Sequence, residues 1–194
     1  MHSISMNKFV AISALVFSVL MIAGSAHATK VAGVTLDDTM MVGEQSLALN
    51  GAGIRKKLFI KLYVGSLYTA EASSSAADIV AGDVAMAIRL NLISNLLTRE
   101  KMVDALIDGF DKSTDGNLAP IQAGIDQLLG VLPEKFESGT AMTLAYEPGV
   151  GTHLMDADES VSVIEGLAFK QALFGIWLSD KPAQASLKKA MLGQ

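Results

Sequence analysis

The sequence predicts a single α+β domain in which an antiparallel sheet is covered on one side by helices. Strand-like segments fill residues 35–69, and two helical segments follow within 98–132. A second group of strand-like segments, 139–166, precedes helices expected at 166–178 and 183–191. Strands and helices occur in blocks, without the strict alternation of parallel folds, which is typical of α+β domains. No internal repeat or linker divides the chain.

Residues 1–28 predict a secretory signal peptide. An apolar run at 9–23 follows Lys8, and the small residues up to Ala28 form an A-x-A cleavage pattern. A transmembrane anchor is the alternative, but the run is shorter than the roughly 20 apolar residues that span a bilayer. We therefore expect a mature domain of residues 29–194 that is exported to the periplasm and has no membrane span.

The composition excludes several classes of protein. Cleavage would remove Lys8, so the formal net charge of −5 would become −6, which argues against binding to a nucleic-acid backbone. The chain has no cysteine, so its stability must come from a hydrophobic core without disulfides.

No metal or cofactor is expected. His153 is the one histidine of the mature chain, and the acidic group Asp156, Asp158 and Glu159 lacks the spacing of an EF-hand. We expect those carboxylates to form a solvated loop and His153 to lie at the surface or at a sheet edge.

Residues 35–69 predict three strands, with turns at 42–44 and at the glycines of 51–53. The glycines resemble a phosphate-binding loop only superficially, because no helix follows them. In the third strand the two-residue period predicts a core face that starts at Leu58 and a mixed face that includes Tyr63. The core face is expected to hold Leu58, Ile60, Leu62 and Val64.

The middle of the chain predicts a short helical turn near 71–82, a strand at 83–93 and then two helices. Thr98 is expected to cap the first helix. The second helix spans 118–132 and ends at Pro133.

Proline and glycines near 148–151 predict a hairpin within 139–155, followed by a strand at 160–166. The helix at 166–178 is expected to present one apolar stripe. The stripe comprises Phe169, Leu173, Ile176 and Trp177.

The segment 50–70 holds the candidate site. Arg55 and Tyr63 beside an apolar sheet face can bind a carboxylate, because guanidinium and phenol groups are both hydrogen-bond donors to it. The alternative is a basic hairpin tip whose cations lie in water while Tyr63 fills the sheet face. Scattered methionines, including Met102, either line a lipophilic site or belong to the core.

Two segments resemble the chalcone isomerase-like superfamily. They are NGAGIRKKLFIKLYVGSLYT and the closing YEPGVGT with GLAFKQALFGIWLSDKPAQASLKKAMLG, and the resemblance extends over residues 36–193. It implies a large antiparallel sheet covered by a layer of helices, with a cleft between them. Plant enzymes of this superfamily cyclise chalcones to flavanones, whereas non-catalytic relatives bind fatty acids.

The resemblance implies binding more than catalysis. The enzymes' arginine falls on Arg55, and their strand threonine falls on Tyr63, a tyrosine as in the fatty-acid-binding relatives. Three other polar positions of the enzymes hold Met102, Gly109 and Ile176. The resemblance thus implies a periplasmic binding protein for a fatty acid or similar lipophilic carboxylate, with Arg55 and Tyr63 at the head group and Met102 along the tail.

Two other interpretations remain at this point. One is an isomerase, an intramolecular lyase acting on a small conjugated or phenolic substrate. The other is a structural domain whose cleft is closed. The interval between Arg55 and Tyr63 is shorter than in the plant enzymes, which leaves open whether Arg55 lies in the cleft or at the hairpin tip. The sequence indicates no oligomeric state.

Overall fold

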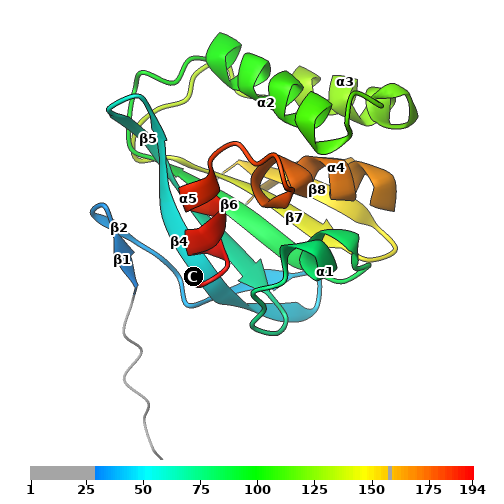
Figure 1. Cartoon of the computed structure of the whole chain (residues 1–194), viewed down its shortest axis with the longest axis horizontal. Coiled ribbons are helices and arrows are strands. Elements are labelled where there is room, and N and C mark those ends of the chain that lie inside the picture. Colours follow the sequence, from blue (N-terminus) through cyan, green and yellow to red (C-terminus); the bar gives the residue numbers. More distant parts are fainter. Residues whose placement is uncertain (1–28, 157–158) are drawn as a thin grey trace, which may run out of the picture.

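A seven-stranded antiparallel sheet with helices on one face forms the protein (Figure 1). The computed structural model describes residues 29–156 and 159–194, so the predicted signal peptide and Asp158 lie outside the described residues. Each strand pairs with the next one in the order β3-β4-β5-β6-β7-β8-β9, so the sheet has no crossover. This arrangement confirms the predicted single α+β domain.

The strands and helices agree with most of the predicted segments. The strands are β1 (Lys30–Val31), β2 (Val34–Thr35), β3 (Thr39–Val42), β4 (Gln45–Lys57), β5 (Ile60–Thr69), β6 (Met86–Leu92), β7 (Ala141–Glu147), β8 (Gly151–Asp156) and β9 (Glu159–Ile164). The helices are α1 (Ala76–Ala81), α2 (Arg99–Ser113), α3 (Gln122–Gly130), α4 (Leu167–Leu178) and α5 (Ala185–Met191). No helix in the described part of the chain is long and apolar enough to cross a membrane.

Local signals account for the two helices that follow β6. The Thr98 side chain accepts a hydrogen bond from the backbone N–H of Lys101 and begins α2, as predicted. The predicted helix at 118–132 is divided into a 3₁₀ turn, Ala119–Ile121, and α3. Proline is favoured in the first turn of a helix, because a backbone N–H there has no hydrogen-bond partner within the helix and its absence costs nothing.

The predicted turn at residues 51–53 is wrong, because β4 continues through these glycines. A Cβ atom on Gly51 would lie 2.3 Å from the carbonyl oxygen of Ala190, and one on Gly53 would lie 2.7 Å from the Ala190 Cβ. The glycines therefore allow the backbone of α5 to pack directly on β4. This role depends on a contact between distant segments, which the local glycine pattern does not reveal.

The turn between β4 and β5 lies instead at Leu58 and Phe59. The strands pair as far as Lys57 and Ile60, which leaves two residues in the turn. Leu58 is 87% exposed and Phe59 is 100% exposed, so the predicted core face does not begin at Leu58. A register shift next to Leu62 adds an extra residue to β5, which changes the side-chain alternation at this end of the strand.

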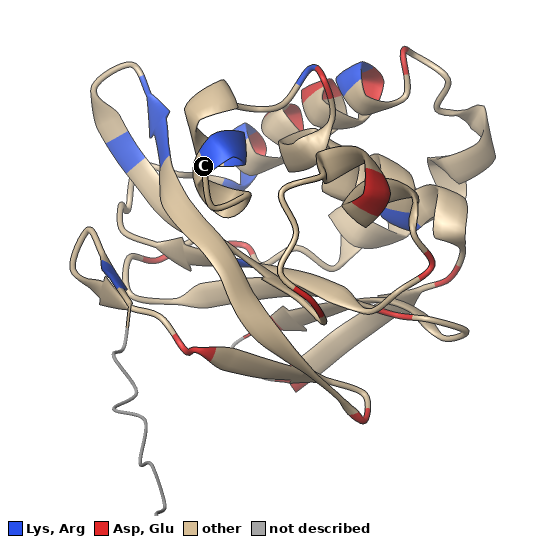
Figure 2. Ribbon diagram, turned by 60° about the horizontal axis from the view of Figure 1, so that its bottom comes forward, with Lys and Arg blue, Asp and Glu red and all other residues tan. Residues whose placement is uncertain are grey.

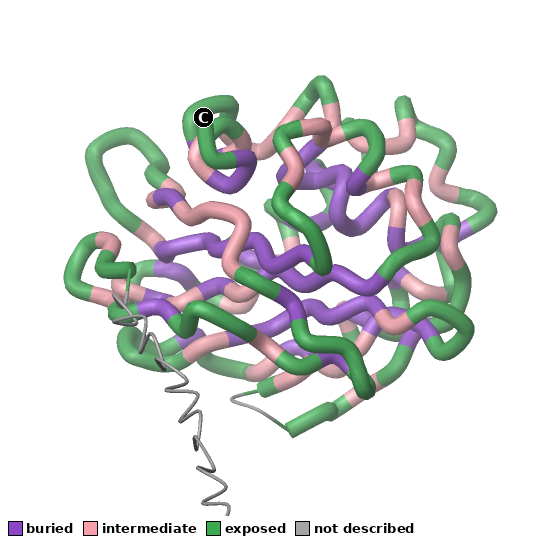
Figure 3. Tube along the Cα trace, turned by 90° about the horizontal axis from the view of Figure 1, so that it is seen from below, coloured by how far each residue is buried: buried purple, intermediate pink, exposed green. Residues whose placement is uncertain are grey.

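Two hydrophobic cores lie on the two faces of the sheet, so most of β5 is buried on both sides. The larger core lies between the sheet and the helices. The smaller one lies on the other face, where the curled sheet brings β3 close to β7. It comprises Val42, Leu47, Tyr68, Ala85, Ala87 and Ala145. Figure 3 shows the buried stretches running through the middle of the sheet.

Helix α4 is buried around almost its whole circumference. Every residue from Phe169 to Leu178 is buried apart from Gln171. The predicted single apolar stripe is therefore too narrow, because α4 contacts α1, α2 and α5 as well as strand β8. A helix that is covered by other elements on all sides is expected to be apolar on all sides.

A buried lysine, Lys170, ties α4 to the C-terminal end of α1. Its Nζ donates hydrogen bonds to the carbonyl oxygens of Ile79 (2.8 Å), Val80 (2.9 Å) and Gly82 (2.7 Å). These carbonyls include the last ones of α1, where a cation is favourable. Burial lowers the pKa of Lys170 to about 8, against the opposing effect of the Asp83 carboxylate.

We predict that Lys170→Met lowers the free energy of unfolding at neutral pH by on the order of 3 kcal/mol, because carbonyl groups at the end of α1 lose their shared donor. Urea denaturation followed by circular dichroism measures this. Lys189→Met, at an exposed position of α5, is the control and should change stability by less than about 0.5 kcal/mol. Equal stability of the two variants would contradict the role given to Lys170.

The pH dependence of this difference is a second prediction. The folded-state pKa of Lys170, about 8, is below the ordinary value of 10.5, so the unfolded chain binds the proton more tightly between these values. The contribution of Lys170 to stability is therefore smallest below pH 8 and rises as the pH increases toward 10.5. Denaturation of wild type and Lys170→Met across this range should show a widening difference, whereas a constant difference would contradict the lowered pKa.

Candidate functional site

A cleft of about 390 Å³ lies between the β4–β5 hairpin and α2. The end of α4 and Ala183, in the connection between α4 and α5, also line it. The volume is within the roughly 300–1,000 Å³ typical of small-molecule sites. Its apolar lining includes Leu62 from β5, Met102, Ala105 and Leu106 from α2, and Ile176 from α4. The cleft therefore lies between the sheet and the helices.

The structure places Arg55, Tyr63 and Met102 in the wall of this one cleft. Arg55 and Tyr63 are directly paired on β4 and β5, so their side chains lie on the same face of the hairpin. Met102 is 4% exposed and contributes from α2 on the other side. The short hairpin does not remove Arg55 from the cleft, because the turn is made by Leu58 and Phe59.

A hydrogen bond between two buried side chains orients Tyr63. The Trp177 Nε1 group donates to the Tyr63 hydroxyl oxygen at 2.9 Å. Burial raises the pKa of Tyr63, opposed by this bond and by the Arg55 guanidinium, so the phenol keeps its proton at neutral pH. Among the described residues no hydrogen-bond acceptor is found for the hydroxyl proton itself, and Tyr63 lines the cleft.

Gln184 holds Arg55 at the cleft wall. Its Oε1 atom accepts hydrogen bonds from Arg55 Nη1 (3.2 Å) and from the backbone N–H of Lys56 (2.8 Å). Its Nε2 atom donates to the Ile54 carbonyl oxygen at 3.0 Å. These bonds fasten the start of α5 to β4, and the Arg55 bond to Gln184 uses Nη1, which leaves other N–H groups of the guanidinium for a ligand.

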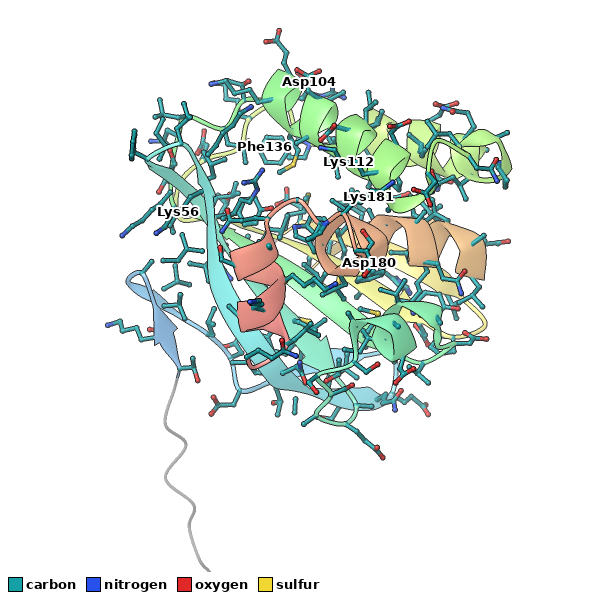
Figure 4. The ribbon with its side chains drawn as sticks, viewed as in Figure 1. Lys56, Asp104, Lys112, Phe136, Asp180 and Lys181 are labelled. Carbon is teal, nitrogen blue, oxygen red and sulfur yellow. The ribbon has the colours of Figure 1, made fainter. Side chains whose placement is uncertain are left out.

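The charges around the cleft are mainly positive, although the chain as a whole is acidic. The cleft is lined by four cations, Arg55, Lys57, Lys101 and Lys112, and two carboxylates, Asp104 and Asp108. Lys112 and Asp108 form an ion pair at 2.6 Å. Figure 2 shows basic residues on the hairpin, and Figure 4 shows Asp104 and Lys112 on α2 across from Lys56. The excess of positive charge around the cleft suits a ligand with an anionic group.

The α2 and α4 helices make close contact at the inner side of the cleft. A Cβ atom on Gly109 would lie 2.7 Å from Ile176 Cγ2. Gly109, Ile176 and Met102 are the three positions where the resemblance places polar groups of the enzymes, and all three line this cleft. Its inner wall is therefore apolar at these positions.

Sequence reasoning missed Trp177 and Gln184 as parts of the site. Trp177 is recognised in the sequence only as a core residue of α4, and Gln184 lies in a segment that shows no pattern other than the start of a helix. A buried indole N–H needs an acceptor, and that requirement is the one sequence signal that could have indicated a polar partner for Trp177.

Other candidate positions lie elsewhere. His153 is on β8, where its Nε2 is 3.3 Å from Glu147 Oε2, and β9 pairs beyond it, so it is not at a sheet edge. No group of three potential metal ligands occurs among the described residues. A second cavity, of about 250 Å³ between the β7–β8 end of the sheet and the loop after α3, is lined by Phe136 and Met142 but by no arginine or tyrosine.

The chain belongs to the chalcone isomerase-like family, because the model of that family matches residues 28–193. Among solved structures, it is similar to a fatty-acid binding protein from Arabidopsis thaliana, with a TM-score of 0.65 and 16% sequence identity. The match covers 82% of this chain and 92% of the plant protein. At this identity the likeness establishes the shared fold. No curated protein sequence matches the chain significantly.

We predict that Gly109→Ala destabilises the protein by about 1–3 kcal/mol, because the new methyl group overlaps Ile176. In an Ile176→Ala background the same change should instead stabilise by up to about 1 kcal/mol, since alanine is the better helix former. Denaturant unfolding of the four proteins measures both effects.

Gly130→Ala in α3 is the matched control, since nothing lies within 4 Å of the added methyl group. If Gly109→Ala has the same effect with and without Ile176, the close packing of α2 on α4 is not what constrains this position.

Proposed function

We propose that the protein is a non-catalytic binding protein for a fatty acid or a similar lipophilic carboxylate. The observation that supports this most directly is that Tyr63, paired with Arg55, lines the cleft and accepts a hydrogen bond from Trp177. Trp177 can only donate, so Tyr63 accepts that bond and its own proton is left for a ligand acceptor. A carboxylate accepts from Tyr63 and from the neighbouring Arg55 at the same time.

The rest of the cleft suits an alkyl chain. Beyond the Arg55 and Tyr63 pair, the walls contributed by Leu62, Met102 and Ile176 are apolar. Burial of methylene groups there is favourable by roughly 0.8 kcal/mol for each group. A ligand with one carboxylate and one chain satisfies both parts of the site, and the plant protein of the same fold is a fatty-acid binding protein.

The same geometry favours binding over an isomerase reaction. The resemblance places polar groups of the enzymes at three positions on the helix side of the cleft, and this chain has Met102, Gly109 and Ile176 at those positions. The Gly109 and Ile176 contact also leaves no space for a larger side chain at position 109. Arg55 and Tyr63 can hold an anion, but Tyr63 itself is no base near neutral pH, because burial raises its pKa.

We predict that the delipidated protein binds a long-chain fatty acid with one-to-one stoichiometry, and that Arg55→Ala weakens the affinity roughly tenfold or more. Tyr63→Phe should weaken it roughly tenfold, because the phenyl ring keeps the shape but loses the donor. Isothermal titration calorimetry measures both, and native mass spectrometry of the untreated protein shows whether a fatty acid copurifies.

Lys189→Ala is the control, because this exposed cation of α5 does not line the cleft. Equal losses in Lys189→Ala and Arg55→Ala would point to nonspecific electrostatics. Absence of fatty-acid binding, together with cyclisation of a chalcone above the spontaneous rate, would establish the isomerase alternative instead.

We also propose that residues 1–28 are a cleaved signal peptide and that the domain acts in the periplasm. The sequence pattern before Thr29 supports this, and the family match begins at residue 28. Expression of the full chain in a Gram-negative host should yield a periplasmic protein that begins at Thr29, as judged by intact mass. A cytoplasmic product that retains Met1 would contradict the proposal.

A further inference from the structure

The tip of the β4–β5 hairpin exposes three consecutive apolar residues. Leu58 is 87% exposed, Phe59 is 100% exposed and Ile60 is 42% exposed. The hairpin projects beyond the body of the sheet, with this turn at its end (Figure 1). A fully exposed phenylalanine next to an exposed leucine gains nothing from folding, so it indicates an interaction surface more than a core position.

The backbone of the turn makes this choice of residues still more unusual. Leu58 has a φ of 57°, in the left-handed region where glycine, asparagine and aspartate are favoured. A bulky side chain at this position is unfavourable for the turn and finds no compensating burial. The apolar tip is therefore not explained by the needs of the hairpin itself.

Cations surround the apolar tip. Lys56, Lys57 and Lys61 are exposed on either side of the turn, and no acidic residue occurs between Glu44 and Glu71. This local excess of positive charge stands out in a chain with a formal net charge of −5. Figure 2 shows the basic residues on both strands of the hairpin. Apolar side chains flanked by lysines match an anionic bilayer surface, where the former enter the acyl region and the latter meet head groups.

We propose that this hairpin tip, Lys56–Lys61, docks the protein on the surface of an anionic lipid bilayer. Leu58 and Phe59 insert among the lipid chains, and the three lysines contact the anionic head groups. A symmetrical contact with a second copy is disfavoured, because it would bring the same lysines together. Membrane docking does not depend on the ligand proposal. It would place the cleft, whose wall includes Lys57 and Leu62, next to the membrane.

Vesicle sedimentation tests the proposal. The chain from Thr29 onward, which contains all the helices and strands of the described residues, is mixed with vesicles of equal parts phosphatidylcholine and phosphatidylglycerol, or of phosphatidylcholine alone. We expect binding to the anionic vesicles that weakens with added salt. Two double variants should each lower the partition constant about tenfold or more. One combines Leu58→Ser with Phe59→Ser, and the other combines Lys56→Glu with Lys61→Glu.

Met41→Ser is the matched control. Met41 is 59% exposed but lies on β3, at the other end of β4 from the tip, so this variant should bind as wild type does. As a second readout, a tryptophan introduced by Phe59→Trp should be quenched by brominated lipid, whereas Trp177, which is 3% exposed, should not.

Three results would overturn the proposal. The first is failure of the wild type to bind anionic vesicles, and the second is binding that is unchanged in both tip variants. The third is a dimer in vesicle-free solution that the Leu58→Ser and Phe59→Ser double variant dissociates, which would assign the tip to a second copy of the chain. Fatty-acid affinity of the tip variants, measured in the same preparations, separates a failure here from a failure of the ligand proposal.

Discussion

Helix α4 is apolar around almost its whole circumference, and the rest of the protein is arranged to bury it. The curled sheet lies on one side, while α1, α2 and α5 cover the others. Two polar groups at its two ends fix its position. Lys170 satisfies carbonyl groups at the end of α1, and Trp177 donates to Tyr63 on β5. In a buried environment each of these bonds has no competing water, so α4 has one favourable register against its neighbours.

The cleft is a consequence of this packing at the C-terminal end of α4. There α2 contacts α4 closely at Gly109, but it diverges from the β4–β5 hairpin, so a space remains between hairpin and helix. The bond that positions Trp177 also sets the direction in which Tyr63 can donate, and Gln184 holds Arg55 beside it. The polar pair of the candidate site is thus oriented by residues whose other function is to hold the core together.

Amphipathic and capping signals predict most elements because they depend on neighbouring residues. Thr98 begins α2 as expected, and the hairpin around residues 148–151 forms between β7 and β8. The segment 50–60 behaves differently. Its glycines suit a turn, yet they lie within β4 because α5 packs on them. The turn is made instead by Leu58 and Phe59, which are not residues that usually form turns. Contacts between distant segments override local preference there.

The sequence by itself determined the fold class and the order of the elements, because these follow from hydrophobic periodicity and need no knowledge of distant contacts. Side-chain chemistry also indicated Arg55 and Tyr63 as a candidate anion site, with a solvated basic hairpin tip as the alternative, and the family resemblance favoured the site. Only the tertiary structure decided that Arg55, Tyr63 and Met102 line one cleft and that the hairpin ends in an exposed apolar tip. It also decided that Trp177 bonds to Tyr63 and that Gln184 bonds to Arg55. The physical reason is that these features depend on the register of β4 against β5 and on the approach of α2, α4 and α5, and long-range packing fixes both.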